Sequence, residues 1–256
     1  MIFYFSGTGN SAYVASIIAQ KLNDRLIAIN EIWQTKQWSY TLQEGEKLGF
    51  IFPVHAWGPP ILLVKVIRHL ILAGNSIPYC YLICTCGDDI GCTVPIMRHL
   101  LKKKGWELSS GYSITMPNTY VCLPGFDVDK DEIIKTKLSG LSQRLPSISN
   151  HIMKKRKNYF EIHPGGLPRI KSYVIRPLFN RFLLKDKPFY SNEQCIGCSI
   201  CAQVCPVNNI EMKKRKPVWK GECTMCLRCF HSCPQHAIHY GRLTKGKGQY
   251  LKKNYN

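Results

Sequence analysis

The sequence predicts an α/β fold with a doubly wound parallel sheet, followed by a small α+β unit rich in cysteine. Apolar strand-like segments alternate with amphipathic helical segments, and three of the strand ends carry glycine-rich loops. Eight cysteines near the C-terminus fall in two equally spaced runs, which predict the second unit. At 256 residues, the chain is long enough for one full core and one small satellite domain.

The first predicted strand, Met1–Phe5, leads directly into a loop of small and hydroxyl residues. An apolar helical pattern begins just after this loop, at Tyr13. Glycines let a ligand approach the backbone, and the amides at a helix N-terminus attract anions. We therefore expect a phosphate site, and its candidate residues are Ser6, Gly7, Thr8, Gly9, Asn10 and Ser11.

This loop alone leaves the ligand open. Gly7–Ala12 also matches the dinucleotide pattern G-x-G-x-x-A, and Glu31 lies near the expected acidic position. A turn with a helix N-cap is a further alternative. A Walker A loop is excluded, because no Gly-Lys-Ser/Thr sequence follows.

Two further buried strands, Lys47–Pro53 and Pro78–Cys84, also end in loops that lead into helices. In a doubly wound sheet the carboxyl ends of parallel strands meet at one edge, so all three loops are expected to face one ligand. The additional candidate residues are Val54, His55, Ala56, Trp57, Gly58, Thr85, Cys86, Gly87, Asp88 and Asp89.

With these three loops in this order, residues 1–150 resemble flavodoxin. The resemblance implies FMN rather than NAD as the ligand, a strand order of 2-1-3-4-5, and the Trp57–Gly58 and Gly87–Asp88 loops on either side of the flavin ring. Flavodoxins commonly stack a tyrosine on the flavin shortly after the Gly-Asp pair, whereas Ile90–Cys92 offers no aromatic residue. That face is expected to be open, or covered by Tyr120 or by the cysteine-rich unit.

The remaining elements of this domain follow in order. We expect a helix over Thr93–Lys104, the end of strand five at Ile114–Met116, and a last helix over Val128–Ile152 that breaks or ends near Pro146. The turn Met116–Tyr120 is either within reach of the cofactor or an ordinary loop.

Residues 153–190 are expected to form a basic connector with one helix, Ile170–Leu184. Its apolar stripe is predicted to pack between the domains and consists of Tyr173, Leu178, Phe179 and Phe182. The tail, 241–256, has several lysines and little apolar content, so it is expected to be solvated or disordered.

The two cysteine runs read C-x2-C-x2-C-x3-C-P, and one constant interval separates each cysteine of the second run from its counterpart in the first. In this signature three cysteines bind one cubane, while the cysteine before proline ligates the other cluster. One predicted [4Fe-4S] set is therefore Cys195, Cys198, Cys201 and Cys233, and the other is Cys205, Cys223, Cys226 and Cys229.

Zinc and disulfides are the alternatives for these cysteines. Zinc has no use for a third cysteine at x2 or for a fourth followed by proline. Disulfides need an oxidising compartment, and Met1–Phe5 is too short for a secretory signal. Residues 191–240 instead resemble the two-cluster bacterial ferredoxins. The protein is expected to be cytoplasmic and without a membrane span, since charged residues interrupt its longest apolar run, Ile61–Ala73.

The net charge of +19 is concentrated in the C-terminal part. Residues 1–150 hold 14 Lys and Arg against 11 Asp and Glu, whereas residues 151–256 hold 21 against 5. We therefore expect acidic redox partner proteins, which would dock on a basic face that includes Lys213–Lys216. Nucleic acid is disfavoured, because the basic residues are dispersed and no aromatic platform accompanies them.

The expected domains are 1–152 (FMN-binding), 153–190 (connector), 191–240 (two clusters) and 241–256 (tail). Together they resemble the flavodoxin/ferredoxin fusion proteins of anaerobic bacteria and archaea. The resemblance implies an intracellular electron-transfer protein that converts between two-electron and one-electron steps, using FMN and two [4Fe-4S] clusters. The alternatives are a reductase acting on its own organic substrate, with Cys86 or His55 near the flavin, and a nucleic-acid-binding iron-sulfur module.

Overall fold

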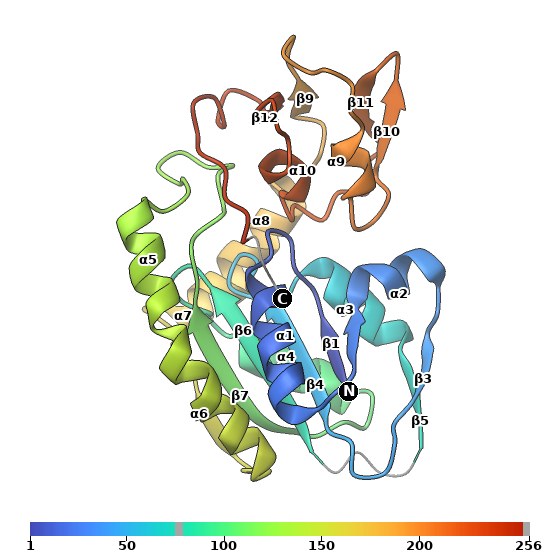
Figure 1. Ribbon diagram of the computed structural model, residues 1–256, viewed down its shortest axis with the longest axis vertical. Helices are drawn as coiled ribbons and strands as arrows, with labels where there is room; N and C mark the ends of the chain where they lie inside the picture. The colour runs from blue at the N-terminus through green and yellow to red at the C-terminus, as the bar shows by residue number, and fades with distance from the viewer. Residues whose placement is uncertain (75–78, 253–256) are drawn as a thin grey trace.

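The computed structural model describes residues 1–74 and 79–252, in two units drawn in Figure 1. Pro78, the first residue of a predicted strand, lies outside the described residues, as do residues 253–256 of the tail. The α/β unit occupies the lower part of the view, and the cysteine-rich unit lies above the ends of its strands.

A six-stranded parallel sheet organises the α/β unit, in the order β2-β1-β4-β6-β7-β8. Its strands are β1 (Ile2–Tyr4), β2 (Leu26–Ala28), β4 (Leu48–Pro53), β6 (Cys80–Cys86), β7 (Leu108–Thr115) and β8 (Tyr159–Glu161). The first five follow the predicted flavodoxin-like order, so the fold class is confirmed. The sixth comes from the segment that was expected to be only a connector, and it pairs with residues 110–112 of β7.

Helices cover both faces of this sheet. They are α1 (Asn10–Leu22), α2 (Ile29–Thr35), α3 (Ile61–His69), α4 (Thr93–Lys102), α5 (Asp131–Ser139) and α6 (Leu141–Met153). One apolar cluster joins α1 and α6 to alternate strand residues such as Ile51, and the other joins α3 and α4 to Phe50. Because both faces are covered, every residue of β6 is buried. A short parallel pair, β3 (Ser39–Thr41) and β5 (Ile71–Ala73), stands apart from the sheet.

The last helical segment of this unit breaks at Gly140, between α5 and α6, and the expectation of a break near Pro146 is wrong. Pro146 lies inside α6, where it removes one backbone donor. A buried stripe on either side of it, which includes Leu141, Leu145 and Ile148, holds the helix against the sheet across that position.

The connector helix runs from Pro168 to Phe182 in three parts: α7 (Pro168–Ile170), the π-helical η1 (Lys171–Ile175) and α8 (Arg176–Phe182). The Arg176 amide bonds the Lys171 carbonyl, five residues earlier, which is the π-helical pattern, and Pro177, which has no amide to donate, follows directly. Tyr173, Leu178 and Phe182 are more than half exposed, so the prediction that they pack between the domains is wrong.

The cysteine-rich unit repeats its backbone geometry with the same interval that relates the two cysteine runs. Its elements are β9 (Phe189–Ser191), α9 (Ile200–Gln203), β10 (Ile210–Lys213), β11 (Lys216–Trp219), α10 (Arg228–His231) and β12 (Ile238–Tyr240). The left-handed residues also recur in pairs, such as Ser199 with Leu227 and Asn208 with His236. Each antiparallel ladder, β9–β12 and β10–β11, takes one strand from each repeat. The duplication read from the cysteines therefore extends to the whole unit.

The tail is ordered as far as Lys252, so the expectation of a solvated or disordered end is wrong for residues 241–252. Gln249 Nε2 donates to the carbonyls of Phe230 and Cys233, and the Lys252 amide donates to the Thr8 carbonyl at 2.9 Å. The tail thus crosses from the cysteine-rich unit to the loop after β1. Within the described residues, no helix has the length and apolar character needed to cross a membrane.

Candidate functional site

A cleft with about 900 Å³ of empty space opens at the carboxyl ends of β1, β4 and β6, beneath the cysteine-rich unit. All three predicted loops line it, as the parallel-sheet argument requires. Of the sixteen candidate flavin-site residues, those in the cleft wall are Ser6, Gly7, Thr8, Asn10, Ser11, Val54, His55, Ala56, Thr85, Cys86 and Gly87.

The other five candidates, Gly9, Trp57, Gly58, Asp88 and Asp89, are not part of this wall. The Trp57 carbonyl accepts a hydrogen bond from Ser172 Oγ, and Asp89 pairs with Lys171 Nζ at 2.5 Å. Trp57 and Asp89 therefore hold the connector helix. The exposed Asp88 accepts the weak Cys86 thiol bond on its carbonyl, at 3.3 Å.

The loop after β1 fits a phosphate. Ser6 Oγ accepts from the Gly9 amide at 3.0 Å and so shapes the turn, while the amides of Gly7, Thr8 and Asn10 have no acceptor among the described residues. The first amides of a helix lack intrahelical partners and point at the anion position. Ser11 Oγ bonds Thr85 Oγ1 at 2.7 Å, which ties this loop to the one after β6.

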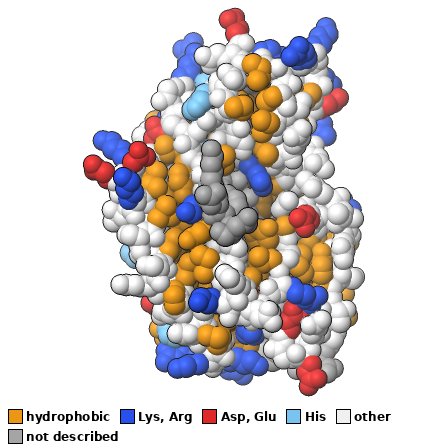
Figure 2. Space-filling model, viewed as in Figure 1, with side chains coloured by type: hydrophobic (Ala, Val, Ile, Leu, Met, Phe, Trp, Pro, Cys, Tyr) orange, Lys and Arg blue, Asp and Glu red, His pale blue; other side chains and the backbone are white. Residues whose placement is uncertain are grey.

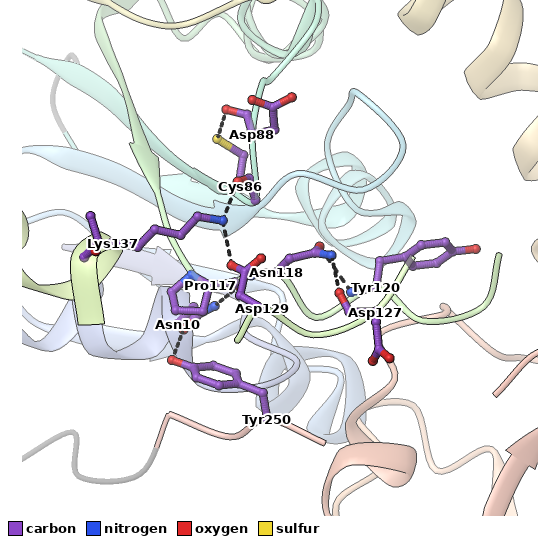
Figure 3. Close-up of polar contacts among 12 residues, drawn as sticks. Asn10, Cys86, Asp88, Pro117, Asn118, Tyr120, Asp127, Asp129, Lys137 and Tyr250 are labelled. Atoms are coloured by element: carbon purple, nitrogen blue, oxygen red, sulfur yellow. Dashed lines mark hydrogen bonds and ion pairs between the residues drawn. The ribbon is translucent and has the colours of Figure 1, made fainter. Parts of the chain in front are cut away.

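A polar network fixes the same loops from outside the cleft (Figure 3). Asn10 Nδ2 donates to the Pro117 carbonyl at 2.9 Å, and the Tyr250 hydroxyl donates to Asn10 Oδ1 at 3.0 Å. The tail residue Tyr250 thereby holds the side chain of a phosphate-loop residue.

Lys137 of α5 performs a similar task for the loop after β6. Its Nζ donates to the Gly87 carbonyl at 2.9 Å. It also donates to Asp129 Oδ2 at 2.6 Å, as Figure 3 shows. Asp129 also accepts from the Asn118 amide at 2.8 Å. The loop after β6 and the turn after β7 are therefore fixed relative to each other by one partly buried cation.

Two titratable groups of the cleft wall, His55 and Cys86, have shifted pKa values. Desolvation, helped by the Arg176 guanidinium, lowers the pKa of His55 to about 4. Burial, with Asp89 and Asp88 nearby, raises the pKa of Cys86 to about 12. Both side chains are therefore neutral at neutral pH.

Sequence reasoning missed part of the cleft wall. The connector helix supplies Phe179, which contacts the Tyr120 ring at 5.9 Å between centroids, and the cysteine-rich unit supplies residues 224–227. Both covers that the sequence suggests for the open flavin face, Tyr120 and the cysteine-rich unit, line the cleft. Phe179 belongs to the predicted apolar stripe, but its spacing cannot show that it faces a ligand.

The seam between the two units is tight at Gly7. A Cβ at this position would lie only 2.5 Å from the carbonyl oxygen of Cys226. Glycine is therefore required here for close approach of two backbones, and the phosphate loop rests directly on a cysteine-bearing loop.

Each predicted cluster set surrounds its own cavity. Cys195, Cys198, Cys201 and Cys233 line one with about 330 Å³ of empty space, and Cys205, Cys223, Cys226 and Cys229 line another with about 310 Å³. No group of three or more Cys, His, Asp or Glu side chains in residues 1–74 and 79–252 is placed to hold a single metal ion. The four sulfur donors of each set line one common space.

The surroundings of these thiols also suit a cluster. Burial raises the pKa of Cys201 and of Cys226 to about 11. The amides of Asn209 and Ala237, which occupy equivalent positions in the two repeats, donate to Cys205 Sγ and Cys233 Sγ at 3.3 Å. Such bonds to sulfur stabilise the negative charge of a cluster.

The flavin-type cleft and the second cysteine cavity share a wall. Thr224, Cys226 and Leu227 line both, so a ligating cysteine separates the two spaces. The cavity of the first set lies nearer the surface, since Cys198 and the adjoining Ile196 are exposed.

The basic hairpin turn, residues 213–216, lies against this first set. Arg215 donates to the Ile196 carbonyl at 3.1 Å, and Lys216 Nζ donates to the Cys195 carbonyl at 3.3 Å. Figure 2 shows Lys and Arg side chains gathered at this upper end of the molecule. The basic face therefore borders the outermost cysteine site.

Comparison with known proteins agrees with this division. Residues 194–238 match a family model described as a 4Fe-4S dicluster domain. No curated protein matches the chain.

Solved structures with a similar fold include a protein of Bacteroides uniformis described as a flavoprotein (16% identity, covering 54% of this chain and 96% of that one, TM-score 0.36). They also include a Trp repressor binding protein from Bacillus subtilis (16% identity, 57% and 97%, TM-score 0.34) and an azoreductase from Bacillus anthracis (10% identity, 60% and 98%, TM-score 0.37). At these identities the likeness concerns the fold alone. The chain joins a flavodoxin-like α/β domain to a segment that matches a 4Fe-4S dicluster model, and this match supports redox chemistry in general.

Proposed function

We propose that the protein binds FMN in the cleft and two [4Fe-4S] clusters at the two cysteine sets, and passes electrons along this series. When bound, FMN exchanges two electrons and hands them on singly, while the clusters carry one electron at a time. The observation that carries the proposal is the shared wall: Cys226, a predicted ligand of the inner cluster, also lines the flavin cleft.

The order of the three sites supports a path for electrons between the outer cluster, the inner cluster and the flavin. The flavin site is enclosed by loops from both units, the set containing Cys226 lies next to it, and the set containing the exposed Cys198 lies outermost. The basic turn beside the outer set supports docking of an acidic donor or acceptor protein there.

Two measurements test this function. Anaerobically reconstituted protein is expected to hold about eight irons and eight sulfides per chain and to bind one FMN, while NADH binds weakly or not at all. Stopped-flow mixing with a one-electron reductant should then show the clusters and the flavin losing absorbance in one coupled sequence. Zinc without inorganic sulfide, or tight NADH binding without FMN binding, would overturn the proposal.

A variant separates the inner and outer sites. Cys198→Ala should remove the outer cluster and slow reduction of the flavin by an acidic protein donor, while flavin and inner cluster still exchange electrons. Turnover of an organic acceptor at unchanged rate in the absence of any partner protein would favour the reductase instead.

A further inference from the structure

The connector helix carries the densest group of exposed apolar side chains in the described part of the chain. Of the 17 large apolar residues that are exposed there, eight fall between residues 167 and 183. They are Leu167, Ile170, Tyr173, Val174, Ile175, Leu178, Phe182 and Leu183, and each has 36 to 69% of its surface exposed to solvent. Contiguous exposed apolar surface of this kind marks an interaction site.

The opposite side of the helix is fixed to the α/β unit, so the exposure is not a consequence of a loose segment. Ser172 is buried and bonds both the Cys92 amide and the Trp57 carbonyl at 2.7 Å. Lys171 pairs with Asp89, and Arg176 donates to the Pro59 carbonyl at 2.8 Å. These bonds fix one side of the helix to the α/β unit and leave the apolar side chains exposed.

Exposed cations border the apolar stripe. Arg169, Arg181, Lys185 and Lys187 are exposed, and none of them forms a salt bridge within the described residues. A second copy of this chain would bring the same cations face to face, whereas an anionic surface would neutralise them. Charge complementarity therefore selects a negatively charged occupant.

The shape of the stripe selects the kind of occupant. It follows one convex helix over about 15 residues, or about 22 Å, and a protein partner would need a matching groove of that length. A lipid bilayer needs no shape complementarity, and an apolar helix face flanked by Lys and Arg is the pattern that lies in the interface of an anionic membrane.

We propose that the helix Pro168–Phe182 docks the protein on the surface of an anionic lipid bilayer, with its apolar stripe inserted at the headgroup boundary. The inference does not depend on FMN or on the clusters. It concerns adsorption on one face of a membrane, not a crossing of it.

Sedimentation with unilamellar vesicles tests the inference on the full-length, cluster-loaded protein. Wild-type protein should bind vesicles that contain roughly one third phosphatidylglycerol in phosphatidylcholine, and should stay in solution with phosphatidylcholine alone. Leu178→Ser with Phe182→Ser should weaken binding by about tenfold or more. Arg181→Gln with Lys185→Gln should weaken it as well, since both the apolar and the charged parts contribute.

The matched control carries the same kind of change elsewhere. Ile71 and Ile133 are 56% and 46% exposed, and Ile71→Ser with Ile133→Ser should leave vesicle binding unchanged. Tryptophan fluorescence measures how deeply the helix inserts into the bilayer. Lipids with brominated acyl chains should quench the fluorescence of the Leu178→Trp variant, and they should not quench that of the Ile71→Trp variant.

Three results would overturn the inference: no binding to the anionic vesicles, equal binding by wild-type protein and the Leu178→Ser/Phe182→Ser variant, or a wild-type dimer in light scattering that this variant dissociates. The last result would assign the stripe to self-association. Circular dichroism and iron content should match wild type in every variant, because all the substituted side chains are at the surface.

Discussion

Single residues decide how closely the two units approach. Gly7 allows the phosphate loop to touch the Cys226 carbonyl, because any side chain there would overlap it. In the same seam Met225 has φ 52°, a left-handed conformation that its counterpart Gly197 adopts without a Cβ penalty. Gly7 therefore shows a constraint imposed by the neighbouring unit, and Met225 shows one imposed by the repeated cysteine loop.

Gly7→Ala should force the phosphate loop away from the Cys226 loop. We expect FMN affinity to fall by about tenfold or more, since overpacking a tight contact costs about 1–3 kcal/mol, and electron exchange between flavin and inner cluster to slow. Flavin titration and stopped-flow absorbance measure the two effects. Gly166→Ala is the matched control, because a Cβ there meets no atom within 4 Å; equal effects of both changes would contradict the role of the seam.

Met225→Gly should relieve the left-handed strain of about 1–2 kcal/mol yet remove a side chain that lines the flavin cleft. The expected result is weaker FMN binding with unchanged iron and sulfide content. Fluorescence titration and metal analysis check this outcome. If FMN bound as tightly as to wild type, Met225 would not contact the flavin.

His55 predicts a pH dependence of stability. Its pKa is lowered from 6.5 to about 4, so between these values the unfolded chain binds a proton that the folded protein does not. This group therefore leaves stability unaffected above about pH 6.5 and lowers it as the pH falls towards 4. From pH 6.5 to pH 5 the loss is about 2 kcal/mol.

Urea unfolding of wild type and His55→Gln between pH 7 and pH 5 measures this contribution as a difference. The variant lacks the titrating group, so its free energy of unfolding should fall less over that range. Parallel pH profiles for the two proteins would mean that His55 is not desolvated.

At the scale of elements, the β10–β11 hairpin has an unusual turn. Lys214 and Arg215 both have positive φ, the geometry of a type I′ turn, for which Asn-Gly is the favoured pair. Lys214 and Arg215 thus occupy two positions whose left-handed backbone conformation is unfavourable for residues with a Cβ. Strain kept at such a site is consistent with a function, and under the proposed function we expect that role to be the docking of an acidic partner beside the outer cluster.

Lys214→Asn with Arg215→Gly should therefore stabilise the hairpin while removing two docking charges. Electron transfer to an acidic one-electron carrier should slow, and its rate should depend less on salt between about 20 and 300 mM, where the Debye length shrinks several-fold. Stopped-flow rates over this series measure both effects. A wild-type rate that is flat across the same salt range would show that the turn is not a docking surface.

Sequence patterns predicted those features that depend on short stretches of chain. The spacing of the cysteines predicted an internal repeat, which appears in the structure as a repeated backbone. It also predicted two ligand sets, and the members of each set line one cavity. The loops after β1, β4 and β6 could be placed together because parallel strands end at one edge. The helix over 168–182 was also expected, since its apolar periodicity is local.

Features that depend on how distant segments dock could not be predicted. Periodicity showed that the connector helix has an apolar stripe, but not that Phe179 faces the cleft while Leu178 and Phe182 face outward. The tail was misread because composition carries no information about Gln249 and Tyr250 finding acceptors in other segments. Pro146 was misread because a buried stripe outweighs one lost backbone hydrogen bond.

At the scale of the whole molecule, the tail joins three parts: the cysteine-rich unit, the turn after β7 and the phosphate loop. Lys247 donates to the Leu123 carbonyl at 2.8 Å, and Tyr250 reaches Asn10. The flavin cleft is therefore enclosed by segments from nearly the full length of the chain.

Tyr250→Phe should remove the hydrogen bond to Asn10 and weaken FMN binding about fivefold, as expected for one bond of about 1 kcal/mol. Deletion of residues 249–256 should weaken it further. Cluster content should stay at the wild-type level in both variants. Lys245→Gln, at an exposed position of the same tail, is the control; unchanged FMN affinity after the deletion would show that the tail does not support the phosphate loop.

The reach of the tail also sets an order of events during synthesis. The phosphate loop is synthesised well before Tyr250 and Lys252, which bond its residues Asn10 and Thr8. Domains generally fold as they emerge, from the N-terminus onward. A nascent chain that has folded its sheet still has an open cleft, and under the proposed function we expect FMN to exchange freely from it. Slow release of FMN is then expected only after the tail has bonded the phosphate loop.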